Sequence, residues 1–129
     1  MPGMGTSEVE RVARPLAKAL REHCWSRGAQ GPRALRPYIA LREYVRRAWE
    51  LRLEAQEECQ YTGALLMDSV LETTGRRHTD SVEEANGLFL AATRLARHLW
   101  ETLEREGVEG FERSAAEVEE FLRREAEAG

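Results

Sequence analysis

Long apolar runs, β-branched residues and paired cysteines are scarce in this sequence. No segment approaches the roughly 18 consecutive apolar residues that a membrane-spanning helix needs, and residues 1–5 lack the charged-then-apolar order of a signal peptide. Isoleucine, valine and threonine together make up 15 of the 129 residues, and no stretch alternates apolar and polar positions. These absences argue against a membrane protein, a secreted protein and a β fold, so we expect a cytoplasmic protein.

Cysteine and lysine are scarce as well. Cys24 and Cys59 stand alone, and without C-x-x-C spacing they cannot form a zinc knuckle or a thioredoxin-type pair. We expect two free thiols near the core. Lys18 is the only lysine beside 18 arginines. Because the guanidinium group is a planar fork that pairs well with carboxylates and phosphates, this composition favours such ion pairs.

The residues that are plentiful are typical of one globular helical domain. Hydrophobic residues make up 42% and charged residues 33% of the chain, and 129 residues suffice for a single core. We predict one all-α domain over residues 1–129, a compact antiparallel bundle of four to five helices joined by short loops. Residues 1–6 are expected to form a flexible N-terminus.

Helix boundaries follow from capping and glycine signals. Ser7 and Ser81 are each followed three residues later by a glutamate, which is the S-x-x-E pattern of a capping box. Glycines mark helix ends, and Gly63 is expected to break a helix that would otherwise be too long for the domain. We predict helices over residues 8–27, from 32 or 37 to about 61, 64–74, 82–106 and 111–127.

The two halves of the chain carry opposite charge. Residues 11–52 hold 11 basic and 3 acidic side chains, a net charge of +8, whereas residues 53–129 hold 8 basic and 18 acidic side chains, a net charge of −10. Three interpretations are open. The halves can neutralise each other within one monomer, the basic end of one molecule can meet the acidic end of another copy or of a partner, or the basic half can bind a nucleic-acid backbone.

A basic ridge is predicted on the first helix. Its members are spaced three and four residues apart and so share one helix face; they are Arg11, Arg14, Lys18 and Arg21. Such a ridge suits phosphate contacts, with nearby aromatic side chains available for base stacking. A net charge of −4 weakens long-range attraction to a polyanion, so this role fits a small subunit of a larger ribonucleoprotein or effector complex.

A second stripe runs along the second helix, away from its main core stripe. It combines aliphatic, tryptophan and arginine side chains at Ile39, Arg42, Arg46, Trp49 and Leu53. Protein interfaces are enriched in tryptophan and arginine and depleted in lysine. We therefore interpret these five residues as a partner-binding face, with a central helix packed on both sides as the alternative interpretation.

Catalytic and metal-binding patterns are missing or incomplete. The sequence holds no P-loop, G-x-G-x-x-G or G-x-S-x-G motif, and its three histidines are far apart. The acidic stretch from Glu54 to Asp68 partly follows the magnesium-binding pattern of MazG-type pyrophosphohydrolases, but Leu65 stands where that pattern needs a carboxylate. We expect no catalytic residues, no bound metal and no cofactor.

The sequence therefore predicts a non-catalytic helical interaction or assembly subunit that binds a protein partner or its own copies. The first alternative is a nucleic-acid-backbone-binding subunit of a larger complex. The second alternative is a metal-dependent helical hydrolase, whose metal would lie in the stretch from Glu54 to Asp68.

Overall fold

The computed structural model describes residues 7–128, which fold into helices and contain no strand. In chain order the elements are α1 (Glu8–His23), the short 3-10 helix η1 (Trp25–Arg27), α2 (Pro32–Glu50), α3 (Ala55–Thr74) and α4 (Val82–Ala128). The predicted all-helical class is confirmed, with four α-helices in this part of the chain. The flexible N-terminus predicted for residues 1–6 lies outside the described residues.

Both predicted capping serines begin a helix. The Ser7 hydroxyl accepts a 3.1 Å hydrogen bond from the Glu10 backbone N–H at the start of α1. The Ser81 hydroxyl accepts a 3.0 Å hydrogen bond from the Glu84 backbone N–H at the start of α4. Each serine thus satisfies one of the N–H groups that the first turn of a helix leaves without a partner.

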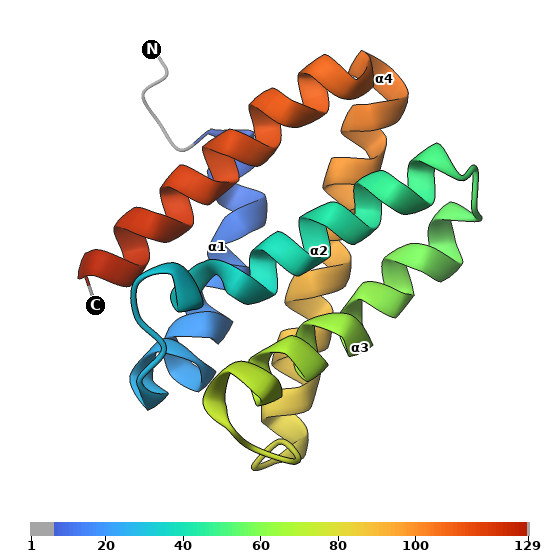
Figure 1. Ribbon diagram of the computed structural model, residues 1–129. Coiled ribbons are helices and arrows are strands. Elements are labelled where there is room, and N and C mark those ends of the chain that lie inside the picture. Colours follow the sequence, from blue (N-terminus) through green and yellow to red (C-terminus); the bar gives the residue numbers. More distant parts are fainter. Residues whose placement is uncertain (1–6, 129) are drawn as a thin grey trace.

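The longest helix, α4, bends sharply at Gly107, where the sequence predicts a helix end. Gly107 has φ 78° and ψ −170°, a conformation that essentially only glycine adopts. We call residues 82–106 the first limb of α4 and residues 108–128 the second limb. Figure 1 shows the chain rising through the first limb and returning along α2 and across α1 in the second limb.

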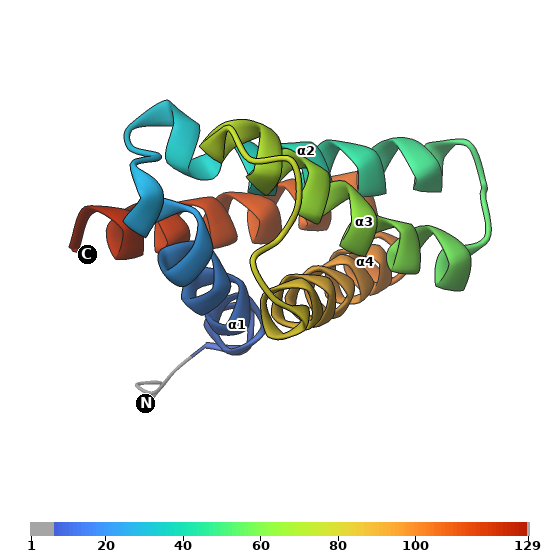
Figure 2. The same cartoon turned by 90° about the horizontal axis from the view of Figure 1, so that it is seen from below.

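The helices are arranged around α4. In Figure 1, α2 and α3 lie side by side, and the second limb follows the other side of α2. Figure 2 shows α1 and the first limb nearly end-on, whereas α2 and the second limb lie across the view, so the helix axes cross. α4 contacts α1, α2 and α3, because its bend brings one limb to each side of the molecule.

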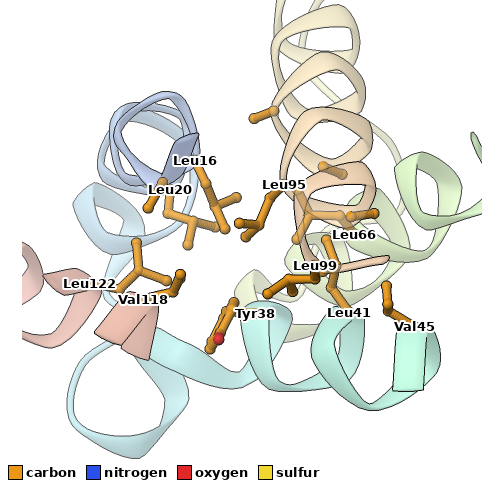
Figure 3. Packing of buried hydrophobic residues seen from close by; sticks show 14 of the residues in the cluster. Leu16, Leu20, Tyr38, Leu41, Val45, Leu66, Leu95, Leu99, Val118 and Leu122 are labelled. Carbon is orange, nitrogen blue, oxygen red and sulfur yellow. The ribbon is translucent and has the colours of Figure 1, made fainter. Parts of the chain in front are cut away.

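The core lies where α1, α2 and α4 meet. Figure 3 shows Leu16 and Leu20 of α1 above Tyr38 of α2, with Leu122 of the second limb beside them. All four side chains are buried. The Tyr38 hydroxyl donates a 2.7 Å hydrogen bond to the Ala115 carbonyl oxygen, so the polar end of the buried ring is satisfied. This bond ties α2 to the second limb.

Gly63 lies inside α3 and does not break a helix, so this prediction is wrong. α2 instead ends at Glu50 and α3 begins at Ala55. The role of the glycine is close packing, because a Cβ atom at position 63 would overlap the Phe89 ring of the first limb. Gly63 is therefore a contact point between α3 and α4 rather than a helix end.

The end of α2 is made by the main chain alone. The Leu53 N–H donates to the Ala48 carbonyl oxygen at 3.1 Å, and the Arg52 N–H donates to the Trp49 carbonyl oxygen at 3.0 Å, which is the Schellman pattern. Arg52 occupies the left-handed position of this motif with φ 60°. Glycine usually takes that position, so the turn has no glycine or proline to mark it in the sequence.

Replacing Gly63 by alanine is expected to lower the free energy of unfolding by about 1–3 kcal/mol, because the added methyl group displaces the Phe89 ring. Helix propensity alone would act in the opposite direction, by about 1 kcal/mol. Urea unfolding of G63A, F89A and the double variant measures the effect. In the F89A background the alanine should be neutral or stabilising, and an equal loss in both backgrounds would contradict this explanation.

Candidate functional site

The predicted partner-binding face of α2 is turned toward the second limb. Arg42 lies beside Glu119, with its Nη1 atom 3.1 Å from the carboxylate Oε1. Arg46 pairs with Glu50 of its own helix at 3.0 Å and with Glu112 of the second limb at 3.5 Å. Both arginines are therefore engaged within the chain, mostly by acidic residues of its other half.

The three apolar members of that face lie in different environments. Trp49 packs half-buried against the core, and its Nε1–H donates a 3.2 Å hydrogen bond to Glu104. Leu53 lies in the turn between α2 and α3 and is 43% exposed. Ile39, near the other end of α2, lines a groove beside the second limb. The structure thus separates the five residues that the sequence grouped together.

The predicted basic ridge of α1 is divided between paired and unpaired charges. Arg21 pairs with a glutamate of the second limb at 2.5 Å, and Arg14 lies 3.9 Å from a glutamate one turn earlier. Arg11 and Lys18 are exposed, and neither has an ion pair within residues 7–128. Two of the four side chains therefore remain available to solvent without an acidic partner.

The charge separation along the sequence brings opposite charges together inside one molecule. The ion pairs that join α1 and α2 to the second limb are Arg21–Glu125, Arg42–Glu119, Arg46–Glu112 and, with the charges reversed, Glu10–Arg124 at 3.8 Å. This arrangement agrees with neutralisation within a monomer. Partly exposed ion pairs contribute little to stability one by one. We therefore infer that they orient the second limb on the body of the domain, by which we mean residues 8–106, and that they do not drive its packing.

A groove of about 860 Å³ lies where α1 ends, α2 begins and the second limb finishes. Its apolar lining includes Trp25, Leu35 and Ile39. Trp25 is fixed in place because its Nε1–H donates a 2.9 Å hydrogen bond to the Ala34 carbonyl oxygen of α2. Concave sites of this size, with apolar walls, are typical of pockets that bind small molecules or parts of a partner protein.

The arginines around the groove already have partners. Arg123 pairs with Glu119 at 2.7 Å and with Glu120 at 2.9 Å, all within the second limb. Arg21, besides its ion pair, holds its guanidinium carbon 5.8 Å from the centre of the Trp25 ring. These contacts leave the apolar side chains as the main recognition feature of the groove.

Comparisons with protein-family models, curated proteins and solved structures found no match. Within residues 7–128, no helix combines the length and apolar content that crossing a bilayer requires. In the same part of the chain, histidine, cysteine and acidic side chains form no group of three or more that could hold a metal ion. The carboxylates of the stretch from Glu54 to Asp68 therefore belong to no such group.

The two thiols of the chain are buried and difficult to ionise. Burial raises the pKa of the Cys24 thiol to about 11, although the charges of Arg76 and Arg33 oppose this shift. Burial also raises the pKa of Cys59. Both cysteines are free and buried, as predicted from the sequence. A buried thiol with a raised pKa is a poor nucleophile, so neither cysteine supports a catalytic role.

Sequence reasoning missed a buried ion pair at the start of α4. The Glu84 side chain is 1% exposed, and its Oε1 accepts hydrogen bonds from Arg76 Nη1 at 3.1 Å and from the Asp80 N–H at 2.7 Å. Its Oε2 lies 2.8 Å from Arg76 Nη2 without forming a hydrogen bond. Burial alone would raise the pKa of Glu84, but these hydrogen bonds and the charges of Arg76 and His23 lower it.

The Glu84–Arg76 pair connects three helix ends. Arg76 lies in the loop after α3 and also donates a 2.8 Å hydrogen bond to the carbonyl oxygen of His23, the last residue of α1. Glu84 belongs to the first turn of α4. The only sequence signal for this pair is the capping box, in which Glu84 is the third residue after Ser81. We assign the pair a structural role, because it is enclosed and lines neither the groove beside the second limb nor either of two smaller hollows of the described chain.

Proposed function

We propose that this protein is a non-catalytic interaction or assembly subunit that binds an apolar helical segment of a protein partner in the groove beside the second limb. The observation that carries the proposal is the 860 Å³ groove lined by Trp25, Leu35 and Ile39. Tryptophan packed in a concave site is typical of interface hot spots. Of the five residues that the sequence suggested as a partner-binding face, Ile39 belongs to this groove.

The charges around the groove favour one kind of partner. Arg21 and Arg123 are already paired with glutamates of the second limb, so a strongly acidic segment would have to compete with existing ion pairs. An amphipathic helix instead places an apolar stripe, at positions i, i+3, i+4 and i+7, in a groove and leaves its charges outside. We therefore propose an amphipathic helix with an uncharged stripe as the occupant.

Ile39→Glu is expected to abolish capture of the partner, because a carboxylate in an apolar interface loses its hydration without gaining a partner. Ala40→Glu is the matched control, since Ala40 is also half-buried on α2 but does not line the groove. Immobilised wild-type, I39E and A40E proteins are exposed to an extract of the source cells, and bound proteins are quantified by mass spectrometry. Each protein that wild type and I39E retain in different amounts is then purified, and its affinity for both is measured by calorimetric titration.

The proposal expects a protein that wild type and A40E retain equally and that I39E loses by at least about tenfold. Circular dichroism of the three proteins should be superimposable, which separates loss of binding from loss of fold. A partner that binds I39E as well as it binds wild type would refute the groove as its site. If no protein of the extract is retained in larger amounts by A40E than by I39E, the proposed interaction function is wrong.

A second candidate function is binding of a nucleic-acid backbone within a larger complex. Arg11 and Lys18 support it, because both are exposed and have no acidic partner within the described residues. Arg14 and Arg21 support it less, since glutamates of the same chain already pair with them. We place protein binding first because the groove is a formed site, whereas the ridge is half neutralised.

A further inference from the structure

The two limbs of α4 are joined by one residue that is not helical. Gly107 alone has non-helical angles in the 47 residues from Val82 to Ala128. A loop of a single residue is the shortest possible connection between two helices, and rotation about its φ and ψ would convert the bent α4 into one straight helix. Short hinges of this kind favour the exchange of an element between two copies of a chain.

Straightening would remove the second limb from its own body. The limb buries one apolar face that includes Phe111, Val118, Phe121 and Leu122. A straight helix of this length measures about 70 Å at 1.5 Å per residue, so the limb would project beyond the body with this face in water. The body would at the same time expose the core surface around Tyr38. Neither apolar surface is stable in water unless another protein surface packs against it.

We propose that two copies of this chain form a dimer by exchanging their second limbs. A second copy is the occupant that reproduces every contact of the vacated surface. The carbonyl oxygen of Ala115 accepts from Tyr38, and Glu119 and Glu112 face Arg42 and Arg46 in the bent chain. The same pairs form between the two copies after exchange. The apolar contacts, the hydrogen bond and the ion pairs of the vacated surface therefore all fit the second limb of the other copy. Limb exchange is a route to self-assembly that is independent of partner binding in the groove.

Gly107→Ala tests the hinge. Alanine disfavours the bent conformation and favours a continuous helix. We expect light scattering of G107A to show a mass twice that of the monomer, at concentrations where wild type is monomeric. The dimerisation constant should rise roughly tenfold to hundredfold. A folded G107A protein that stays monomeric would overturn the proposal.

A charge-exchange experiment tests the exchange with Gly107 intact, and so remains decisive if G107A does not fold. R42E/R46E and E112R/E119R each place like charges between their own body and limb. A heterodimer with exchanged limbs restores opposite charges at all these positions, whereas a monomer or a homodimer of either variant does not. The two proteins are unfolded in urea, mixed, refolded together and weighed by native mass spectrometry.

The matched control mixes R36E/R47E with E109R/E117R. These side chains lie on the same two elements, are exposed, and form no ion pair with each other within residues 7–128, and the variants carry the same net charges as the test pair. We expect at least about tenfold more heterodimer in the test mixture than in the control. Equal amounts of heterodimer in both mixtures, or monomers alone in the test mixture, would overturn limb exchange.

Discussion

Replacing Arg76 by methionine is expected to lower the free energy of unfolding by about 3–5 kcal/mol, because it removes the arginine partner of the buried Glu84 carboxylate and leaves only the His23 ring, whose Nδ1 lies 3.8 Å from Oε2. The exposed fractions of the two side chains are 14% and 1%, so water cannot replace the missing partner. The variant also loses the hydrogen bond to the carbonyl oxygen of His23, which joins the loop after α3 to the end of α1.

The double variant R76M/E84L is the control for this prediction. Removal of both charges avoids an unpaired buried ion, so the loss should be clearly smaller than the sum of the losses in R76M and E84L. Urea unfolding of wild type, both single variants and the double variant completes the cycle. Losses that simply add would show that the two side chains stabilise the fold separately.

The same pair makes the fold sensitive to acid. The pKa of Glu84 in the folded chain lies below its ordinary value of 4.5. Its contribution to stability is therefore complete above about pH 4.5 and is lost as the pH falls toward the lowered pKa. As the pH falls below about 4.5, the stability of wild type should decrease more steeply than that of R76M/E84L. Parallel curves would assign the acid sensitivity to other carboxylates.

Phe111→Ala is expected to cost about 3–5 kcal/mol of unfolding free energy, because it opens a cavity between the second limb and α2. Phe111 is 1% exposed and lies close to Arg42 and Arg46 of α2. Val108→Ala is the control, since Val108 belongs to the same limb but is 36% exposed; it should cost less than about 1 kcal/mol. Similar losses in the two variants would show that the limb is not packed through its Phe111 face.

The starts of α1 and α4 and the bend of α4 were predictable, because a capping side chain forms each start and a residue without a side chain permits the bend. Ser7 and Ser81 accept hydrogen bonds from first-turn N–H groups, and Gly107 adopts angles that other residues avoid. The end of α2 was not predictable, because main-chain hydrogen bonds form it around Arg52. Gly63 was misinterpreted because a glycine that admits a neighbouring ring looks the same in sequence as a glycine that ends a helix.

The candidate site was harder to predict than the fold. Charge counts showed that the halves are opposite, but they could not show which atoms meet. Arg42 and Glu119 are 77 positions apart, as are Tyr38 and Ala115, and both contacts exist only because α4 bends. Trp25 lies in a connection between helices, where no periodic pattern places it beside Leu35 and Ile39. The groove therefore had no signature in the sequence beyond Ile39 and Arg21, which the sequence placed on two different surfaces.

The position of the second limb at the end of the described chain has a consequence for synthesis on the ribosome. Because translation proceeds from the N-terminus, α1 and α2 emerge before the acidic segment that pairs with them has been made. Until that segment appears, Leu16, Leu20 and Tyr38 lack part of their cover. Residues 1–106 hold 16 basic and 16 acidic side chains, so the nascent chain has no net charge at that stage. The second limb, with 3 basic and 7 acidic side chains, thus gives the growing polypeptide its net charge of −4 as it closes the interior.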